Sequence, residues 1–304
     1  PERIQPRTAD ESVLIVGAGP AGLEAARALG QRGYHVTLAE QALEAGGRVA
    51  NERRLPGLAE WGRVADYRLY QISQMPNVEL YLDSKITPEM VGEFAADHVA
   101  IATGARWSAD GIGRQNPLGV AAAEGTQILT PDDVMAGTVP DGPVVVFDDD
   151  HFYMGGAIAE KLRRAGCDVT LVTPAVEVSS WTQNTLDQHA VQKQLLELGV
   201  KIVTAHNLAE LRTSEADVAC IYTDATQTIP CGTAVFVTMR LPVDDLWHAV
   251  PDATRIGDAL GPSTIAAAVY SGHQYARSLG STMQDNVPFR RELVELAPPC
   301  RETN

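Results

Sequence analysis

The sequence predicts an α/β fold with two parallel sheets, because two strand–helix–strand units can be recognised in its 304 residues. The first unit covers residues 12–40 and the second covers residues 143–172. In each unit a short apolar run precedes a helix, as expected of a buried parallel strand and its crossover helix. A chain of this length exceeds the usual size of one domain, so we expect two domains.

The first unit contains the clearest motif of the chain. A strand is expected over residues 13–16, and it leads into the turn Gly17-Ala18-Gly19-Pro20-Ala21-Gly22 and then a helix. Gly17 permits the tight turn, Gly19 lets a pyrophosphate approach the backbone, and Gly22 lets helix and strand pack closely. The helix N-terminus adds free N–H groups and a partial positive charge. Together these features predict a dinucleotide site of the Rossmann type.

The segment after this helix supplies further candidate ligands. A strand over 34–39 ends at Glu40, where a carboxylate can accept hydrogen bonds from ribose hydroxyls and disfavours a 2′-phosphate. We expect Gly46 and Gly47 to let the backbone close over the pyrophosphate, and a plain flexible loop is the alternative.

Helical spacing over residues 55–74 predicts a helix on which Trp61, Tyr67 and Tyr70 pack on the core. A strand is expected over 77–82, and another over 97–104 ends in Thr103 and Gly104, where the chain would pass the cofactor.

The second unit repeats the pattern without its glycines. Strands are predicted over 143–147 and 168–172 with a helix over 155–165, but the turn reads Asp148-Asp149-Asp150-His151. We expect these carboxylates to face the place of the phosphates and to repel them. The unit therefore keeps the fold and loses NAD(P) binding. A metal site is the alternative, but adjacent residues in one turn rarely converge on one ion, so we predict no metal.

The remaining elements complete the predicted organisation. A helix over 186–198 and strands over 200–203, 218–222 and 226–230 would finish the second domain, and a strand over 233–237 would return to the first. The predicted limits are thus 1–139 and 234–304 for the first domain, with 140–233 inserted in it. Gly257 and Asp258 precede a helix predicted over 259–271, so Asp258 would lie at the ribityl or terminal phosphate end of a cofactor, or simply cap the helix.

Composition excludes several classes of partner. The 24 basic and 39 acidic residues give a formal charge of −15, which argues against nucleic acid or an anionic membrane. No apolar run reaches the roughly 18 residues of a membrane span, so we expect a cytoplasmic protein. The four cysteines lack CxxC spacing, which argues against a cysteine-ligated cluster within this chain. The chain begins at Pro1, so a processed product, a subunit or a fragment is expected.

Seven short motifs, spread over most of the chain, resemble the C-terminal two-domain portion of the trimethylamine dehydrogenase and histamine dehydrogenase family. They are VLIVGAGPAG (13–22), LPGLAEW (55–61), IATGARW (101–107), DDDHFYMGG (148–156), SSWTQNT (179–185), IGDALGPSTIAAA (256–268) and VPFRRE (287–292). The resemblance implies two Rossmann-like dinucleotide-binding domains of the glutathione-reductase type, the second inserted in the first.

The resemblance also implies a function. In that family a flavin-bearing barrel with FMN oxidises the amine, a [4Fe–4S] cluster follows, and electrons pass to an electron-transferring flavoprotein or a similar acceptor. This portion binds ADP, a relic of an FAD site, within a homo-oligomer, and carries no catalytic residue.

By the same resemblance, the pyrophosphate turn comprises Gly17, Gly19 and Gly22, and Glu40 binds the adenosine ribose. Gly46, Gly47 and Arg48 contact the phosphates. Arg48 departs from trimethylamine dehydrogenase, which has a histidine at this position. Thr103, Gly104, Gly257 and Asp258 line the rest of the pocket.

Two other interpretations remain open at this point. One is a self-contained FAD-binding, NAD(P)H-dependent oxidoreductase, against which the second turn argues. The other is an ADP-sensing or assembly domain, suggested by the acidic composition and the lack of a catalytic constellation.

Overall fold

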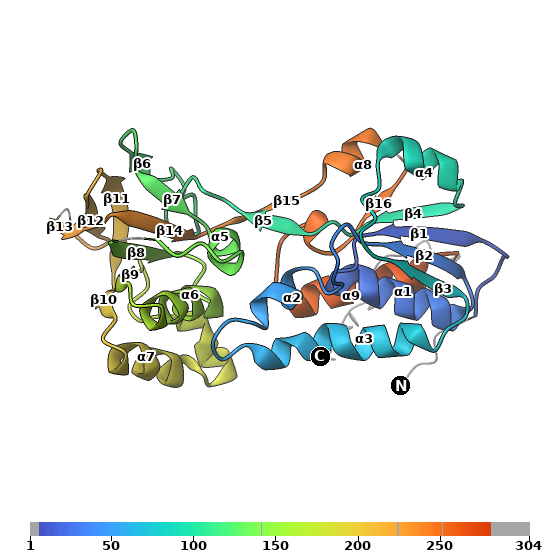
Figure 1. Cartoon of the computed structure of the whole chain (residues 1–304), viewed down its shortest axis with the longest axis horizontal. Helices are drawn as coiled ribbons and strands as arrows, with labels where there is room; N and C mark the ends of the chain where they lie inside the picture. The colour runs from blue at the N-terminus through green and yellow to red at the C-terminus, as the bar shows by residue number, and fades with distance from the viewer. Residues whose placement is uncertain (1–5, 141, 224, 251, 281–304) are drawn as a thin grey trace, which may run out of the picture.

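The structure is a computed structural model that describes residues 6–140, 142–223, 225–250 and 252–280. It has two lobes joined by a narrow connection (Figure 1). The motif at 287–292 and Cys300 lie outside the described residues.

The first lobe is built on a parallel sheet in the order β16-β4-β1-β2-β3. Its strands are β1 (Ser12–Val16), β2 (His35–Ala39), β3 (Val78–Tyr81), β4 (His98–Ile101) and β16 (Thr254–Arg255). Alternate residues of β1 face opposite sides, so both faces of the sheet need covering. Ile15 packs in the cluster that holds helices α1 (Pro20–Arg32), α3 (Arg63–Ser73) and α9 (Ile265–Ser278). Leu14 packs in the hydrophobic cluster on the opposite face of the sheet, with α4 (Pro88–Phe94) and α8 (Asp245–Ala249).

The second lobe contains another five-stranded parallel sheet, in the order β10-β9-β8-β14-β7. Its strands are β7 (Gln127–Leu129), β8 (Pro143–Asp148), β9 (Asp168–Val172), β10 (Lys201–Val203) and β14 (Thr233–Val237). Helices α6 (Tyr153–Arg164) and α7 (Gln188–Glu197) cover one face, and α5 (Pro131–Met135) follows β7. The other face packs on a sheet made of β6 (Ala121–Ala122), β11 (His206–Leu211), β12 (Glu215–Cys220) and β13 (Thr226–Pro230).

The expectation that residues 233–237 return to the first lobe is wrong. All five residues of β14 are buried, and the strand lies between β8 and β7 in the second sheet. A fully apolar strand can lie inside either parallel sheet, so the sequence of β14 does not show which of the two sheets it joins. The domain limits at 139/140 and 233/234 stay predictions, and this pairing favours limits that keep β7 and β14 together.

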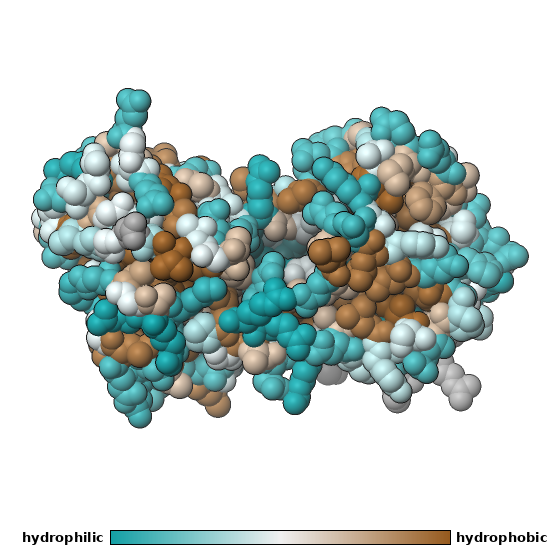
Figure 2. All heavy atoms as spheres, in the orientation of Figure 1, coloured by the Kyte–Doolittle hydropathy of each residue, from teal (hydrophilic) through white to brown (hydrophobic). Residues whose placement is uncertain are grey.

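The chain crosses between the lobes as a two-stranded antiparallel ribbon. β5 (Ala105–Trp107) pairs with β15 (Arg240–Pro242), and Trp107 is the register partner of Arg240. The space-filling view shows hydrophilic side chains gathered around the hollowed waist between the lobes (Figure 2).

A second contact between the lobes comes from the segment 53–62, which ends in the short 3₁₀ helix η1 (Ala59–Gly62). Leu55 and Leu58 belong to the core of the second lobe, and Trp61 packs edge-on against Tyr153 at 5.4 Å between ring centroids. The predicted helix therefore begins only at Arg63.

The aromatic residues predicted to pack along this helix differ in their outcome. Trp61 packs as expected, but Tyr67 and Tyr70 are 54% and 64% exposed, so that part of the expectation is wrong. Among the described residues, no helix has both the length and the apolar character that crossing a membrane would require.

Candidate functional site

A cavity of about 580 Å³ opens at the carboxyl ends of β1, β2 and β4. In open parallel sheets, this edge is where ligands bind. The predicted residues that line it are Gly17, Gly19, Pro20, Ala21, Glu40, Gly47, Arg48, Thr103, Gly104 and Asp258. Four predicted residues lie behind this lining: Ala18, Gly22, Gly46 and Gly257.

The three fingerprint glycines have different tasks. Gly17 has a φ of +105°, and a Cβ there would lie 2.4 Å from the carbonyl oxygen of Ala102. A Cβ on Gly22 would lie 1.9 Å from the carbonyl oxygen of Gly17. A Cβ on Gly19 would meet only the Cα of Gly47, at 3.9 Å. Gly17 and Gly22 are therefore required by packing, whereas Gly19 leaves its backbone open to the cavity.

Glu40 holds the glycine turn in place. Its carboxylate is buried and accepts hydrogen bonds from the backbone N–H groups of Ala18 (2.8 Å) and Ala42 (2.9 Å). Each oxygen has a second lone pair, and the side chain also lines the cavity, so ribose binding by Glu40 stays a prediction.

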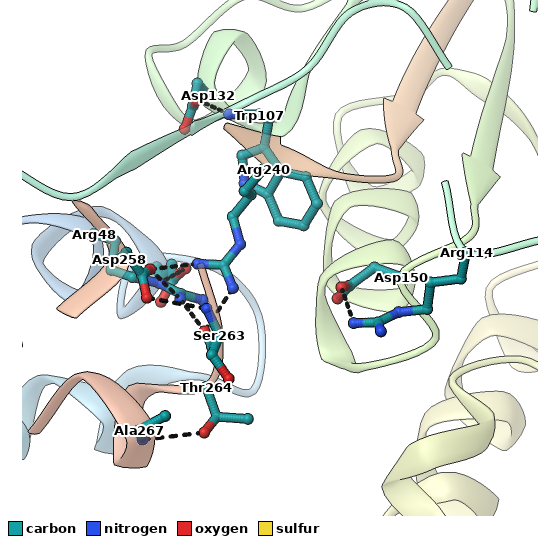
Figure 3. A network of polar contacts seen from close by, with 11 residues as sticks. Arg48, Trp107, Arg114, Asp132, Asp150, Arg240, Asp258, Ser263, Thr264 and Ala267 are labelled. Atoms are coloured by element: carbon teal, nitrogen blue, oxygen red, sulfur yellow. Dashed lines mark hydrogen bonds and ion pairs between the residues drawn. The ribbon is translucent and has the colours of Figure 1, made fainter. Parts of the chain in front are cut away.

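At the other end of the cavity, two arginines meet at one carboxylate (Figure 3). Arg48, the first residue of α2 (Arg48–Glu52), donates from Nη1 to Asp258 Oδ2 (3.1 Å) and to the Ser263 carbonyl (3.0 Å). Arg240, on β15, donates from Nη1 to the same Asp258 oxygen and from Nη2 to the same carbonyl, both at 2.6 Å. Glu52 accepts from Arg48 Nε at 2.7 Å.

Burial and mutual charge shape this group, which we call the arginine cluster: Arg48, Glu52, Arg240 and Asp258. Burial raises the pKa of Glu52 although Arg48 opposes the rise. Burial disfavours the charged form of Arg48, but Glu52 and Asp258 outweigh it and raise its pKa. Burial and the charge of Arg48 lower the pKa of Arg240. Neighbouring carboxylates therefore balance the positive charge of Arg240 less fully than that of Arg48.

Sequence reasoning found Arg48 and Asp258 but missed Glu52 and Arg240. The spacing of Arg48 and Glu52 is that of a helical ion pair, so Glu52 carried a readable signal. Arg240 lies in no recognised motif, and only the pairing of β15 with β5 brings it to the cavity.

The acidic turn of the second unit differs from the expectation. Asp148 and Asp149 are fully buried and point into the protein, not toward a phosphate position. Asp148 Oδ1 accepts from the N–H groups of Asp150 (3.2 Å) and His151 (3.0 Å). Asp149 Oδ2 accepts from the N–H groups of Gln115 (2.9 Å) and Asn116 (3.1 Å).

The segment 110–119 thus lies against the turn and covers it. His151 Nε2 is 3.0 Å from Asp149 Oδ1, and Arg114 pairs with Asp150 at 3.5 Å and stacks on Trp181.

In the part of the chain that the structure describes, no group of three or more acidic, histidine or cysteine side chains is placed to hold a metal ion.

Asp148 predicts an unusual pH dependence of stability. Burial raises its pKa to about 7 from an ordinary value of 3.8, so the folded protein binds the proton more tightly than the unfolded chain. The contribution of protonated Asp148 to the free energy of unfolding is complete below pH 4 and is lost as the pH rises through 7. The change in the free energy of unfolding is on the order of a few kcal/mol. Asp148→Asn keeps the acceptor oxygen without the charge, so we expect a higher thermal midpoint than wild type at pH 8 and a similar one at pH 4. The exposed Asp168→Asn is the control, and a lower midpoint for Asp148→Asn at pH 8 would contradict the assignment.

Known proteins resemble the chain over almost its whole length. The model of the pyridine nucleotide-disulphide oxidoreductase family matches residues 11–251. Dimethylamine dehydrogenase of Hyphomicrobium sp. is 32% identical over 96% of this chain and 45% of its own length.

Two solved structures also match, and both confirm the predicted resemblance to amine-oxidising enzymes. Histamine dehydrogenase from Rhizobium sp. 4-9 is 46% identical, with a TM-score of 0.93, over 98% of this chain and 48% of that one. The 6-hydroxypseudooxynicotine amine oxidase from Pseudomonas geniculata N1 is 40% identical, with a TM-score of 0.90, over 92% of this chain and 44% of that one. The chain therefore spans about half the length of the relatives it matches.

Proposed function

We propose that this chain, which belongs to the pyridine nucleotide-disulphide oxidoreductase family, has a specific place in a larger enzyme. It is the nucleotide-binding portion of a flavin- and iron–sulfur-dependent amine dehydrogenase. The observation that carries the proposal is the contrast between the two turns. The first turn opens onto a cavity with cations at its end, whereas the second is filled by its own acids and by the segment 110–119. The relatives dimethylamine dehydrogenase and histamine dehydrogenase supply the proposed reaction class.

The cavity suits ADP in its chemistry. An adenosine ribose would hydrogen-bond to Glu40, and the diphosphate would cross the open backbone at Gly19 toward Arg48. Thr103 and Gly104 lie further along, where the Thr103 hydroxyl donates to the Val243 carbonyl and the Gly104 carbonyl accepts from the Val243 N–H. Full FAD is the alternative ligand.

The chemistry on the amine would then belong to another portion of the protein. We propose that FMN and a [4Fe–4S] cluster are held there, because among the described residues the three cysteines do not form a ligand group. An electron-transferring flavoprotein or a similar acceptor would receive the electrons, and the assembly would be a cytoplasmic homo-oligomer without nucleic-acid or membrane partners. This chain would bind nucleotide and perform no amine chemistry.

A second candidate is a self-contained FAD-binding, NAD(P)H-dependent oxidoreductase, which the family match favours. The buried turn at 148–151 argues against it, because a pyridine nucleotide would have to displace the segment 110–119 from Asp149.

The test is the absorbance spectrum of the purified chain, followed by mass spectrometry of the nucleotide that heating releases. We expect a colourless protein that releases ADP and does not oxidise added NADH. Flavin absorbance that NADH bleaches would favour the second candidate and exclude the first.

A further inference from the structure

The arginine cluster lines one end of the cavity. Arg240 comes from the ribbon between the lobes, and its guanidinium lies beside the Trp107 ring, 5.5 Å from the ring centroid. Figure 3 shows the side chain extending from the ribbon past Trp107 toward Asp258 and Ser263. The Arg240 side chain makes two hydrogen bonds of 2.6 Å and is 13% exposed, so it is held in one position in the cavity wall.

The cluster also uses the hydrogen-bonding capacity of Asp258. Its Oδ2 accepts from both Arg240 and Arg48, and its Oδ1 accepts from the Ser263 N–H at 3.1 Å. A ribityl chain that reached this position would offer neutral hydroxyl groups, for which Asp258 would be the natural acceptor. The Oδ2 of Asp258 is already directed at two stronger, charged donors, and its Oδ1 at a backbone N–H.

Two guanidinium groups at one end of a phosphate turn match a particular ligand. The terminal phosphoryl group of a nucleoside diphosphate is joined to the rest of the ligand by a single anhydride bond and carries about two charges near neutral pH. In a flavin dinucleotide the same phosphorus also forms an ester bond to the ribityl chain, so it keeps one charge and the chain continues beyond it. A doubly charged terminus suits two arginines, whereas a ribityl–flavin extension needs the space and the carboxylate that Arg240 occupies.

We propose that Arg240 is the residue that determines ligand specificity, binding the terminal phosphate of a nucleoside diphosphate and blocking the ribityl–flavin half of a dinucleotide. The inference rests on the proposed nucleotide function of the cavity and names its ligand class. Arg48 assists from the first turn of α2, and Asp258 positions both guanidinium groups.

The test compares ADP and FAD as ligands of the nucleotide-free 304-residue chain by titration calorimetry. We expect wild type to prefer ADP by at least about 100-fold and Arg240→Ala to weaken ADP binding about 10- to 100-fold while gaining affinity for FAD. The purified variant would then turn yellow with FAD. Arg240→Lys keeps the charge without the planar fork, so its ADP/FAD ratio should lie between those of wild type and Arg240→Ala.

Arg255→Ala is a matched control. Arg255 also pairs with an aspartate, Asp244, and lies 3.9 Å over a tryptophan ring, Trp247, but it does not line the cavity. It should leave both affinities unchanged. An unchanged ADP/FAD ratio in folded Arg240→Ala and Arg240→Lys would overturn this inference alone, as would wild type binding FAD as tightly as ADP. Wild type that binds neither ligand would overturn the nucleotide function and this inference with it.

Discussion

Replacing Gly19 by valine is expected to abolish nucleotide binding and to leave the protein folded. The backbone of Gly19 has a φ of −76°, which any residue adopts, and an added Cβ would meet no protein atom closer than 3.9 Å. The side chain would therefore extend into the cavity, where the diphosphate must approach the backbone. We expect the affinity for ADP to fall by at least about 100-fold, with little change in the thermal midpoint.

The neighbouring glycines would give a less informative result. Alanine at Gly17 or Gly22 would place its Cβ against backbone oxygens at 2.4 or 1.9 Å, so those variants lose stability as well as binding. Gly92→Val is the matched control, because Gly92 is exposed on α4, has open space around it and does not line the cavity. Calorimetric titration with ADP checks both variants, and an unchanged affinity in Gly19→Val would show that the diphosphate binds elsewhere.

Removing the carboxylate of Asp258 should cause the largest loss of stability among the site variants. Asp258 is 5% exposed and is the shared partner of Arg48 and Arg240, so Asp258→Ala leaves two mostly buried cations next to each other, with Glu52 as the remaining carboxylate of the cluster. Breaking a buried ion pair from one side costs about 3 kcal/mol or more. We expect the thermal midpoint to fall by about 5–10 °C.

The comparison for this effect is Asp66→Ala. Asp66 also binds an arginine through two hydrogen bonds, to Arg53 at 2.8 and 2.9 Å, but it is 52% exposed, so its loss should cost less than about 1 kcal/mol. Saturating ADP should restore part of the stability of Asp258→Ala, because the terminal phosphate supplies the missing negative charge. Equal midpoints for the two variants without nucleotide would show that the arginine cluster contributes no more than a surface pair.

The sequence predicted the strands of the βαβ units and the first of their turns well, because each follows from local chemistry. The strand over 168–172 is found with the predicted bounds, as is the strand over 226–230 in the four-stranded sheet. The glycine turn is as expected, since its steric requirements are met within a few residues. The predicted helix over 259–271 instead begins at Ile265, because Thr264 caps it by accepting the N–H of Ala267.

Features that depend on distant pairing could not be read in the same way. The place of β14 required knowledge of its neighbours, and the inward direction of Asp149 required the segment 110–119, which is more than 30 residues earlier in the chain. Arg240 belongs to the same class, because its role arises only where β15 meets β5. The predicted ligand roles of Glu40, Arg48 and Asp258 stay predictions, although the structure brings all three to one cavity.

The ribbon of β5 and β15 has a consequence for the order in which the protein is made. The strands of the second lobe all lie between residues 121 and 237, so its two sheets come from one continuous length of chain. The first lobe needs β16 and α9, which come after every strand of the second lobe in the chain, and domains fold as units during synthesis. The second lobe can therefore complete its folding while β1 to β4 still await their last partners. The cavity, which requires Arg240, Asp258 and Ala268, forms only after the second lobe has been made, so nucleotide capture would mark a first lobe whose last elements are in place.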